Sequence, residues 1–169
     1  MYNIGIIGAG KVGVSLGRYL SGLEYTNLVG YYSRSLDSSA YAAKVTNSGK
    51  FTNIEKLVEK SNVILITTPD DMISQVWSTI SKFSIQNKIV CHCSGSLSSE
   101  IFFDRSSKGA SGCSMHPILA ISSKENSYKD LASAFFTLEG QDEAVEFFSR
   151  VLDSKGNKYK VLSSREKTK

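Results

Sequence analysis

The sequence of 169 residues lacks the patterns that mark several large classes of protein. It has only two prolines, no proline-rich or low-complexity stretch and no internal repeat, so we expect a single domain of ordinary size. No apolar run reaches the ~18 residues of a membrane-spanning helix, and we expect neither a membrane partner nor a signal peptide. The three cysteines are odd in number and lie in apolar segments, which favours reduced thiols and a cytoplasmic location.

The charge of the chain is nearly balanced, with a formal net charge of +4. No basic stripe interleaved with aromatic residues is present, so we expect no nucleic-acid partner. Part of the basic excess lies in the last dozen residues, where a solvated tail is the expected structure. Its members are Lys158, Lys160, Arg165, Lys167 and Lys169.

Apolar runs typical of buried strands alternate along the chain with segments of helical periodicity. We expect strands at 2–7, 27–32, 62–68, 87–94, 109–115, 134–140 and 157–162, with a short strand or turn at Phe51. We expect helices at 11–22, 37–47, 53–61, 71–83, 96–103 and 141–156, with Asn53 and Asp70 as N-caps and Gly156 as a C-terminal stop. This order predicts an α/β fold with an open, mainly parallel sheet of seven or eight strands and helices on both faces.

Three glycines, Gly8, Gly10 and Gly13, have the spacing G-x-G-x-x-G between the first strand and the first helix. In that position the first glycine permits a tight turn, the second lets a pyrophosphate approach the backbone, and the third permits close packing. We therefore expect residues 8–13, which include Ala9, Lys11 and Val12, to bind a dinucleotide. The alternative is a glycine-rich turn that serves packing alone.

The end of the second strand distinguishes between the two nicotinamide cofactors. An NAD site of this type carries an acidic residue about 20 residues after the glycines, whereas this chain has Ser33 there, followed by Arg34 and Ser35. A guanidinium flanked by two hydroxyls suits a 2′-phosphate, so the expected cofactor is NADP(H). The alternative for Arg34 is a solvated loop arginine, and Asp37 is too far along the chain to replace the acid.

The ordered set of the glycine loop, "YYSRS", "ITTPDDMI", "CHCSGSLSSEIF" and "SMHPILAIS" resembles a family of NADP-dependent oxidoreductases. In that family a Rossmann-like domain precedes a helical dimerisation domain, and pyrroline-5-carboxylate reductase and the β-hydroxyacid dehydrogenases are distant relatives. The resemblance implies a Rossmann-like, doubly wound three-layer α/β/α fold over residues 1–162, NADP(H) binding and hydride transfer. It further implies that residues 163–169 begin a linker to a helical domain, that the longer protein is a homodimer, and that apolar residues near 115–121 are exposed.

Two strand ends carry residues suited to the nicotinamide side of such a site. Thr67, Thr68 and Pro69 lie at the end of one strand, and the resemblance places them beside the ribose and nicotinamide. For Asp70 and Asp71 we favour helix capping. At the end of the next strand, Ser94 and Gly95 form a small polar turn that faces nicotinamide or substrate, or else is a plain loop with Ser96 as an N-cap.

His116 is followed by Pro117 after a further strand, and we expect it to contact substrate or cofactor. The alternative is a histidine that only orders its loop. Cys91 and Cys93 should share one face of their strand and His92 the other, a spacing that does not favour zinc. We therefore expect no metal, and Ser94 lacks the sequence context of a hydrolase nucleophile.

Together these features predict an NADP(H)-binding domain of an oxidoreductase that acts on a small carbonyl, imine or alcohol. Two alternatives stay open, which are a non-catalytic module that senses NADP(H) and a structural domain whose glycines serve packing.

Overall fold

The structure, a computed structural model, describes residues 1–169, which form eight strands, seven α-helices and two short 3-10 turns. The strands are β1 (Tyr2–Ile7), β2 (Thr26–Tyr32), β3 (Gly49–Phe51), β4 (Val63–Ile66), β5 (Ile89–His92), β6 (Ser111–Ile118), β7 (Phe135–Gly140) and β8 (Tyr159–Val161). The helices are α1 (Lys11–Leu20), α2 (Leu36–Thr46), α3 (Ile54–Lys60), α4 (Asp70–Ile80), α5 (Ser127–Asp130), α6 (Asp142–Lys155) and α7 (Ser164–Lys167), and the turns are η1 (Ser99–Ile101) and η2 (Leu131–Ser133).

All eight strands belong to one sheet with the order β3-β2-β1-β4-β5-β6-β7-β8. Every neighbouring pair is parallel except β6 and β7, which are antiparallel. The chain runs outward from β1 to β3 and then returns to β4 on the other side of β1. The direction of winding therefore reverses between β1 and β4, and a crevice opens there at the carboxyl ends of the strands. The predicted doubly wound, mainly parallel α/β fold is confirmed.

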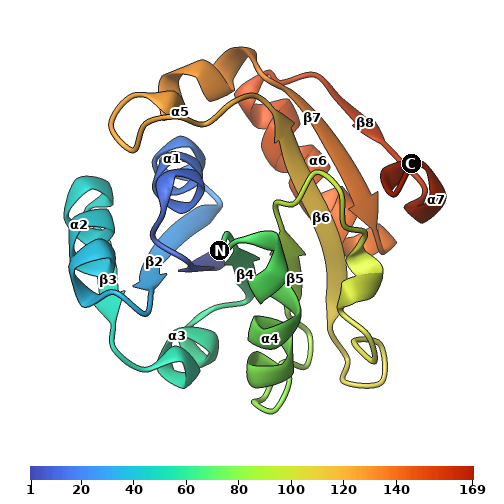
Figure 1. The fold of residues 1–169 in the computed structure, drawn as a ribbon, viewed down its shortest axis with the longest axis horizontal. Coiled ribbons are helices and arrows are strands. Elements are labelled where there is room, and N and C mark those ends of the chain that lie inside the picture. Colours follow the sequence, from blue (N-terminus) through green and yellow to red (C-terminus); the bar gives the residue numbers. More distant parts are fainter.

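Helices cover both faces of the sheet, which gives three layers (Figure 1). α1, α2 and α6 pack on one face, and α3 and α4 pack on the other. The strand β4 shows why both faces need cover, because Val63 and Leu65 point into the first core and Ile64 and Ile66 into the second. All four side chains are fully buried, and a strand buried on both faces reads as a continuous apolar run.

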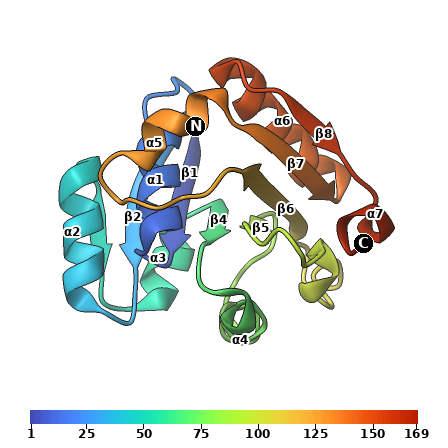
Figure 2. The ribbon, with the colours of Figure 1, turned by 45° about the horizontal axis from the view of Figure 1, so that its top comes forward.

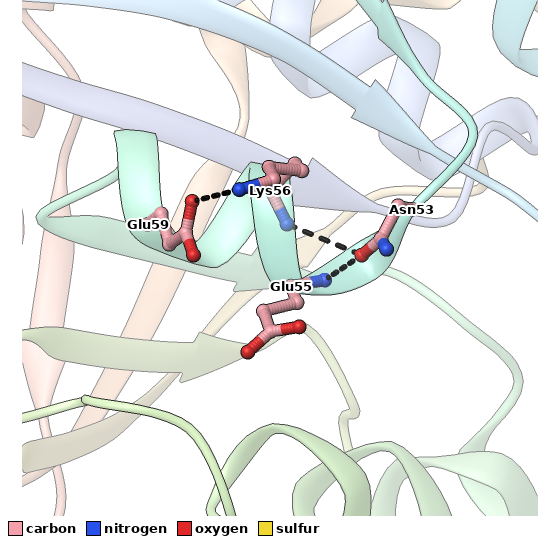
Figure 3. Close-up of polar contacts among 4 residues, drawn as sticks. All are labelled: Asn53, Glu55, Lys56 and Glu59. Carbon is pink, nitrogen blue, oxygen red and sulfur yellow. Dashed lines mark hydrogen bonds and ion pairs between the residues drawn. The ribbon is translucent and has the colours of Figure 1, made fainter.

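Two predicted helix ends are confirmed. The side chain of Asn53 caps α3, because its Oδ1 atom accepts hydrogen bonds from the backbone amides of Glu55 at 2.8 Å and Lys56 at 3.3 Å (Figure 3). The Lys56 ammonium and the Glu59 carboxylate, 3.0 Å apart, pair along the same helix. At the end of α6, Gly156 adopts a left-handed conformation with a φ of 77°, which favours glycine.

The helix predicted at 96–103 is absent, and the structure has only the 3-10 turn η1 there. Serines in this segment bond elsewhere instead of supporting a helix. The amide and hydroxyl of Ser99 both donate to the buried carboxylate of Glu139 on β7, at 2.7 and 2.8 Å. This tertiary contact takes the place of the predicted helix.

The strand predicted at 109–115 instead spans Ser111–Ile118, so His116 lies inside β6 rather than after it. β5 pairs with β6 only as far as Ser114, and from there β6 continues alongside β7. Pro117 is tolerated because β5 no longer pairs with β6 at that point. His116 therefore projects two residues beyond the last residue of β6 that pairs with β5.

Candidate functional site

Three loops meet at the point where the sheet reverses its winding, after β1, β2 and β4. Between them and α4 lies a cleft of about 320 Å³, called here the main cleft. It is lined by Ile7, Gly8, Ala9, Gly10, Tyr32, Ser33, Arg34, Ile54, Thr67, Thr68, Pro69, Met72, Gln75, Val76 and Thr79. Eight of the residues predicted from the sequence for the three loops thus line one cavity. Its remaining lining comes from Ile7, Tyr32, Ile54 and the face of α4, which the sequence did not single out for the site.

The three glycines of the first loop meet different spatial requirements. Gly8 has a φ of 109°, and a Cβ atom there would lie 2.8 Å from the Oγ1 atom of Thr67. A Cβ atom on Gly13 would lie 2.2 Å from the carbonyl oxygen of Gly8. At Gly10, the N-cap of α1, a Cβ atom would meet nothing within 4 Å. Packing therefore explains Gly8 and Gly13, whereas Gly10 leaves free space at a helix N-terminus, where backbone amides favour an anion.

The two threonines after β4 differ in their hydrogen bonding. The Thr67 hydroxyl donates to the carbonyl oxygens of Gly8 at 3.0 Å and Ile7 at 3.3 Å, so it holds the glycine loop against β4. The Thr68 hydroxyl is buried and has no hydrogen-bond partner in the chain. Because buried hydroxyls are normally paired, this atom at the cavity wall fits a group supplied by a ligand.

The loop after β2 places Ser33 and Arg34, but not Ser35, in the lining of the main cleft. Arg34 is exposed and its guanidinium takes part in no ion pair with the chain. The Ser35 hydroxyl caps α2, where it accepts a hydrogen bond from the amide of Ser38 at 3.2 Å. Asp37 lies in the first turn of α2 and is not part of the cleft.

A second hollow of about 400 Å³ adjoins the main cleft towards β5. Its lining is Gly10, Lys11, Val12, Thr67, Thr68, Pro69, Asp70, Cys93, Ser94 and Ile121. The residues Gly10, Thr67, Thr68 and Pro69 line both cavities. The two cavities together extend from the end of β2, past the glycine loop, to the end of β5. Of the predicted residues, Gly13, Ser35, Gly95 and His116 line neither cavity.

The prediction that Asp70 caps α4 is wrong. Pro69 occupies the N-cap position without a side-chain cap, and Asp70 is the first residue of the helix. Its Oδ2 atom accepts hydrogen bonds from the hydroxyls of Ser94 at 2.7 Å and Ser96 at 3.2 Å. The Ser94 oxygen in turn accepts the backbone amides of Ser96 and Leu97. Asp70 therefore fixes the loop after β5 to the start of α4, at the wall of the second hollow.

The two histidines occupy different environments. His92 is fully buried, its Nδ1 atom accepts the amide of Ser94 at 3.2 Å, and its Nε2–H donates to the carbonyl of Ser98 at 3.1 Å. Burial lowers the pKa of His92 below its usual value of 6.5, so this ring is a neutral structural group.

The ring of His116 is half-buried and lies against Gly95, where a Cβ atom would approach Nε2 to 2.9 Å. Its Nδ1–H donates to the carbonyl of Cys93 at 3.1 Å. Burial lowers the pKa of His116, which leaves a neutral ring whose Nε2 atom can accept a hydrogen bond. Gly95 and His116 thus lie against each other, next to Cys93, which lines the second hollow.

Lys167 is a buried residue that sequence reasoning missed. The predicted solvated tail is wrong at this position, because Lys167 is only 6% exposed and its Nζ atom lies 3.5 Å from the hydroxyl of Thr137. Thr137 is the cross-strand partner of His116. Burial lowers the pKa of the Lys167 ammonium. A signal was present in the sequence, since Ser163 and Glu166 form a capping box that starts α7.

The cysteines are free, with Cys91 and Cys113 buried and Cys93 half-buried. As predicted, Cys91 and Cys93 face one core, while the ring of His92 packs against Phe102 on the opposite face. No three potential metal-ligating residues lie together. No helix in the structure has the length and apolar character needed to cross a membrane.

The predicted apolar exposure near 115–121 is confirmed at Ile118, which is 57% exposed beside its cross-strand partner Phe135. Met115 and Pro117 are buried, contrary to that expectation, because β6 continues through them.

The fold and its crevice define an α/β domain of the doubly wound class. The sequence profile of the Rossmann-like domain matches residues 1–117, and the chain belongs to that family. This confirms the Rossmann-like fold implied by the resemblance. A comparison with curated protein sequences found no significant match.

Solved structures similar to this chain include several dehydrogenases and reductases. BF3122 from Bacteroides fragilis, provisionally named an NADP oxidoreductase, has a TM-score of 0.84 at 18% identity, over 99% of this chain and 62% of that one. A prephenate dehydrogenase from Aquifex aeolicus, solved with NAD+, has a TM-score of 0.78 at 18% identity, over 99% and 62%. An imine reductase from Pseudomonas sp. has a TM-score of 0.77 at 15% identity, over 99% and 57%. The chain thus spans about three fifths of these proteins, and the likeness shows the shared fold.

Proposed function

We propose that this chain is the NADP(H)-binding domain of an oxidoreductase that transfers hydride to or from a small carbonyl, imine or alcohol. The observation that supports it best is the free space at Gly10 beside the unpartnered buried hydroxyl of Thr68, on a cleft at the switch point of the sheet. The similarity of the fold to several dehydrogenases and reductases agrees with this class.

Each part of the cleft has a role in this proposal. The loop Gly8–Gly13 holds the pyrophosphate at the N-terminus of α1. Ser33 and Arg34 hold the 2′-phosphate, which Arg34 is free to approach because no acidic side chain of the chain pairs with it. Ser35, proposed from the sequence for the same role, caps α2 instead. Thr67, Thr68, Pro69, Ser94 and Gly95 form the nicotinamide side. When bound, the cofactor supplies or accepts the hydride.

His116 is the proposed contact to the substrate. Its Nδ1–H is committed to the carbonyl of Cys93, so a neutral His116 presents Nε2 as a hydrogen-bond acceptor. Such a ring accepts a proton from a substrate hydroxyl or binds a protonated nitrogen. A homodimer completed by a helical domain, which the family resemblance implies, also belongs to this proposal. A cytoplasmic location belongs to it as well, because the three cysteines are free.

A thermal-shift titration with NADPH and NADH tests the proposal. NADPH should raise the Tm at lower concentrations than NADH, because only NADPH carries the 2′-phosphate. The matched control for an Arg34→Ala variant is Arg165→Ala. It removes one arginine charge from an exposed site that is not part of the cleft, and it should bind both cofactors like the wild type. No rise in Tm with either cofactor would contradict the proposal and favour a purely structural domain.

Turnover separates an enzyme from a sensing module. The protein is assayed together with its proposed helical domain, because turnover is expected to need that domain. A panel of small carbonyls, imines and alcohols is screened by absorbance of the reduced nicotinamide. If the protein is a sensor, it should bind NADPH but consume it with no member of the panel. If it is an oxidoreductase, it should consume NADPH with at least one member.

A further inference from the structure

The segment 119–126, called here the strap, joins β6 to α5 on the face of the sheet that α1 and α2 cover. Figures 1 and 2 both show it leaving β6 and passing alongside α1 in the direction of α2. Leu119 and Ile121 pack against the core that α1 shares with the sheet. Ile121 also lines the second hollow, together with Val12, Thr68 and Ser94. The strap thus forms part of the wall at one end of the site.

Two side chains of α1 hold the strap. The hydroxyl of Ser15, fully buried beneath it, donates to the carbonyl oxygen of Ser123 at 3.3 Å. The Nη1 atom of Arg18 donates to the carbonyl oxygen of Glu125 at 2.9 Å, and the same guanidinium lies 4.2 Å from the centre of the Tyr128 ring. Arg18 therefore fixes the far end of the strap and the start of α5 at once.

The carboxylate of Glu125 ties the strap to itself and to α2. One oxygen accepts the hydroxyl of Ser123 at 2.9 Å, and the other accepts the hydroxyl of Tyr41 at 3.1 Å. The Ser123 oxygen also accepts the amides of Glu125 and Asn126. The strap is therefore a compact turn held from two neighbouring helices.

We propose that Arg18 is a positioning residue, which acts through the strap to hold Ile121 over the nicotinamide end of the cofactor and keep water from it. The proposal rests on the proposed function for the orientation of the cofactor, with the adenosine end at Arg34 in the main cleft and the nicotinamide end in the second hollow. Arg18 itself lines neither cavity. The same helix α1 presents its N-terminus to the pyrophosphate and its last turn to the strap, so one rigid element places both. Water exclusion at the nicotinamide favours hydride transfer over side reactions.

The test compares two probes that report on different ends of the site. Adenosine 2′,5′-bisphosphate lacks nicotinamide and reports on the main cleft alone. NADPH fluorescence rises when the nicotinamide leaves water, so it reports on the second hollow. Arg18→Ala is compared with Arg150→Ala, which removes an arginine that lies 4.1 Å from the ring of Tyr25 and is remote from the strap. Tyr41→Phe provides a milder release of the strap through one lost hydroxyl, and it decides the question if Arg18→Ala does not fold.

In Arg18→Ala the rise in NADPH fluorescence should fall by about half or more and the Kd for NADPH should increase by about three- to tenfold, the range for one lost hydrogen bond. The Kd for adenosine 2′,5′-bisphosphate should stay within about twofold of the wild type. Tyr41→Phe should show a smaller change of the same kind, and Arg150→Ala none. If folded Arg18→Ala keeps the wild-type NADPH fluorescence and affinity, or loses affinity equally for both probes, the proposed role of the strap is overturned. The proposed function is not affected by either result. If the wild type binds neither probe, the proposed function fails and this inference fails with it.

Discussion

Replacing Gly10 with valine and Gly13 with alanine separates ligand binding by the glycine loop from its packing. A Cβ atom at Gly10 meets no atom within 4 Å, and the φ of −80° there suits any residue. A Cβ atom at Gly13 falls 2.2 Å from the carbonyl oxygen of Gly8 and 2.6 Å from the hydroxyl of Thr67. The first substitution therefore fills the cleft without a clash inside the chain, whereas the second pushes α1 away from its loop.

The two changes should have opposite profiles. Gly10→Val loses a favourable N-cap residue, which costs roughly 0.5–1 kcal/mol of unfolding free energy. Gly13→Ala overpacks the contact between helix and loop, which costs about 1–3 kcal/mol, or roughly 2–4 °C in Tm for each kcal/mol. The valine also blocks backbone hydrogen bonds to a pyrophosphate, each worth about 1.5–3 kcal/mol because the acceptor is charged. Two lost bonds reduce the affinity for NADPH by more than roughly 100-fold.

Calorimetric titration with NADPH gives the affinities, and thermal unfolding followed by circular dichroism gives the Tm. Gly10→Val should unfold within a few degrees of the wild type and bind no measurable NADPH. Unchanged NADPH affinity in folded Gly10→Val would refute the assignment of the loop as a cofactor cradle. A Gly13→Ala variant as stable as the wild type would refute the packing argument.

Three further changes probe other atoms of the site. Arg34→Ala should weaken NADPH binding by ~1.5–3 kcal/mol in the same titration and leave NADH unchanged; equal losses for both cofactors would make Arg34 structural. Thr68→Val removes a buried hydroxyl without a partner, so the unfolding free energy should stay the same or rise by up to about 1 kcal/mol while NADPH affinity falls by about 0.5–1.5 kcal/mol. Unaltered affinity would show that no ligand uses this hydroxyl. Burial lowers the pKa values of His92 and His116, so the folded chain binds fewer protons than the unfolded chain between those lowered values and 6.5. Acidification below pH 6.5 should therefore reduce stability, by up to about 1.4 kcal/mol per pH unit for each histidine, and His116→Asn should remove one share of that slope. An unchanged slope of Tm against pH in this variant would contradict the buried, neutral ring.

The sequence was sufficient to predict the parts of the fold that depend on local patterns. The run of apolar residues in β4 is buried on both faces, and the spacing of Gly8, Gly10 and Gly13 places them between β1 and α1. Loops after parallel strands meet at one edge of the sheet, so the convergence of residues 33–34 and 67–69 on one cleft followed from the order of elements alone.

Other features depend on contacts between distant residues, which no local pattern encodes. Asp70 has the residue type of an N-cap, but its carboxylate binds hydroxyls of the loop after β5. The segment at 96–103 has helical periodicity, but the Glu139 carboxylate, forty residues beyond Ser99, takes its amide and hydroxyl. β6 ends three residues later than predicted, because it pairs with β7 as far as Ile118. In each case a tertiary hydrogen bond competes with the local preference and prevails.

The end of the chain combines both kinds of cause. The capping box of Ser163 and Glu166 is a local signal, and it starts one turn of helix. Whether that turn is solvated or buried depends on β7, where the Glu139 carboxylate accepts the hydroxyl of Ser164 at 2.9 Å. With the turn anchored in this way, its last residue, Lys167, is directed onto Thr137 beside His116 rather than into water. Lys167, which the composition assigns to a solvated tail, is therefore buried close to His116, the proposed substrate contact. The cause is the Glu139 carboxylate, which binds both Ser99 and Ser164 of α7.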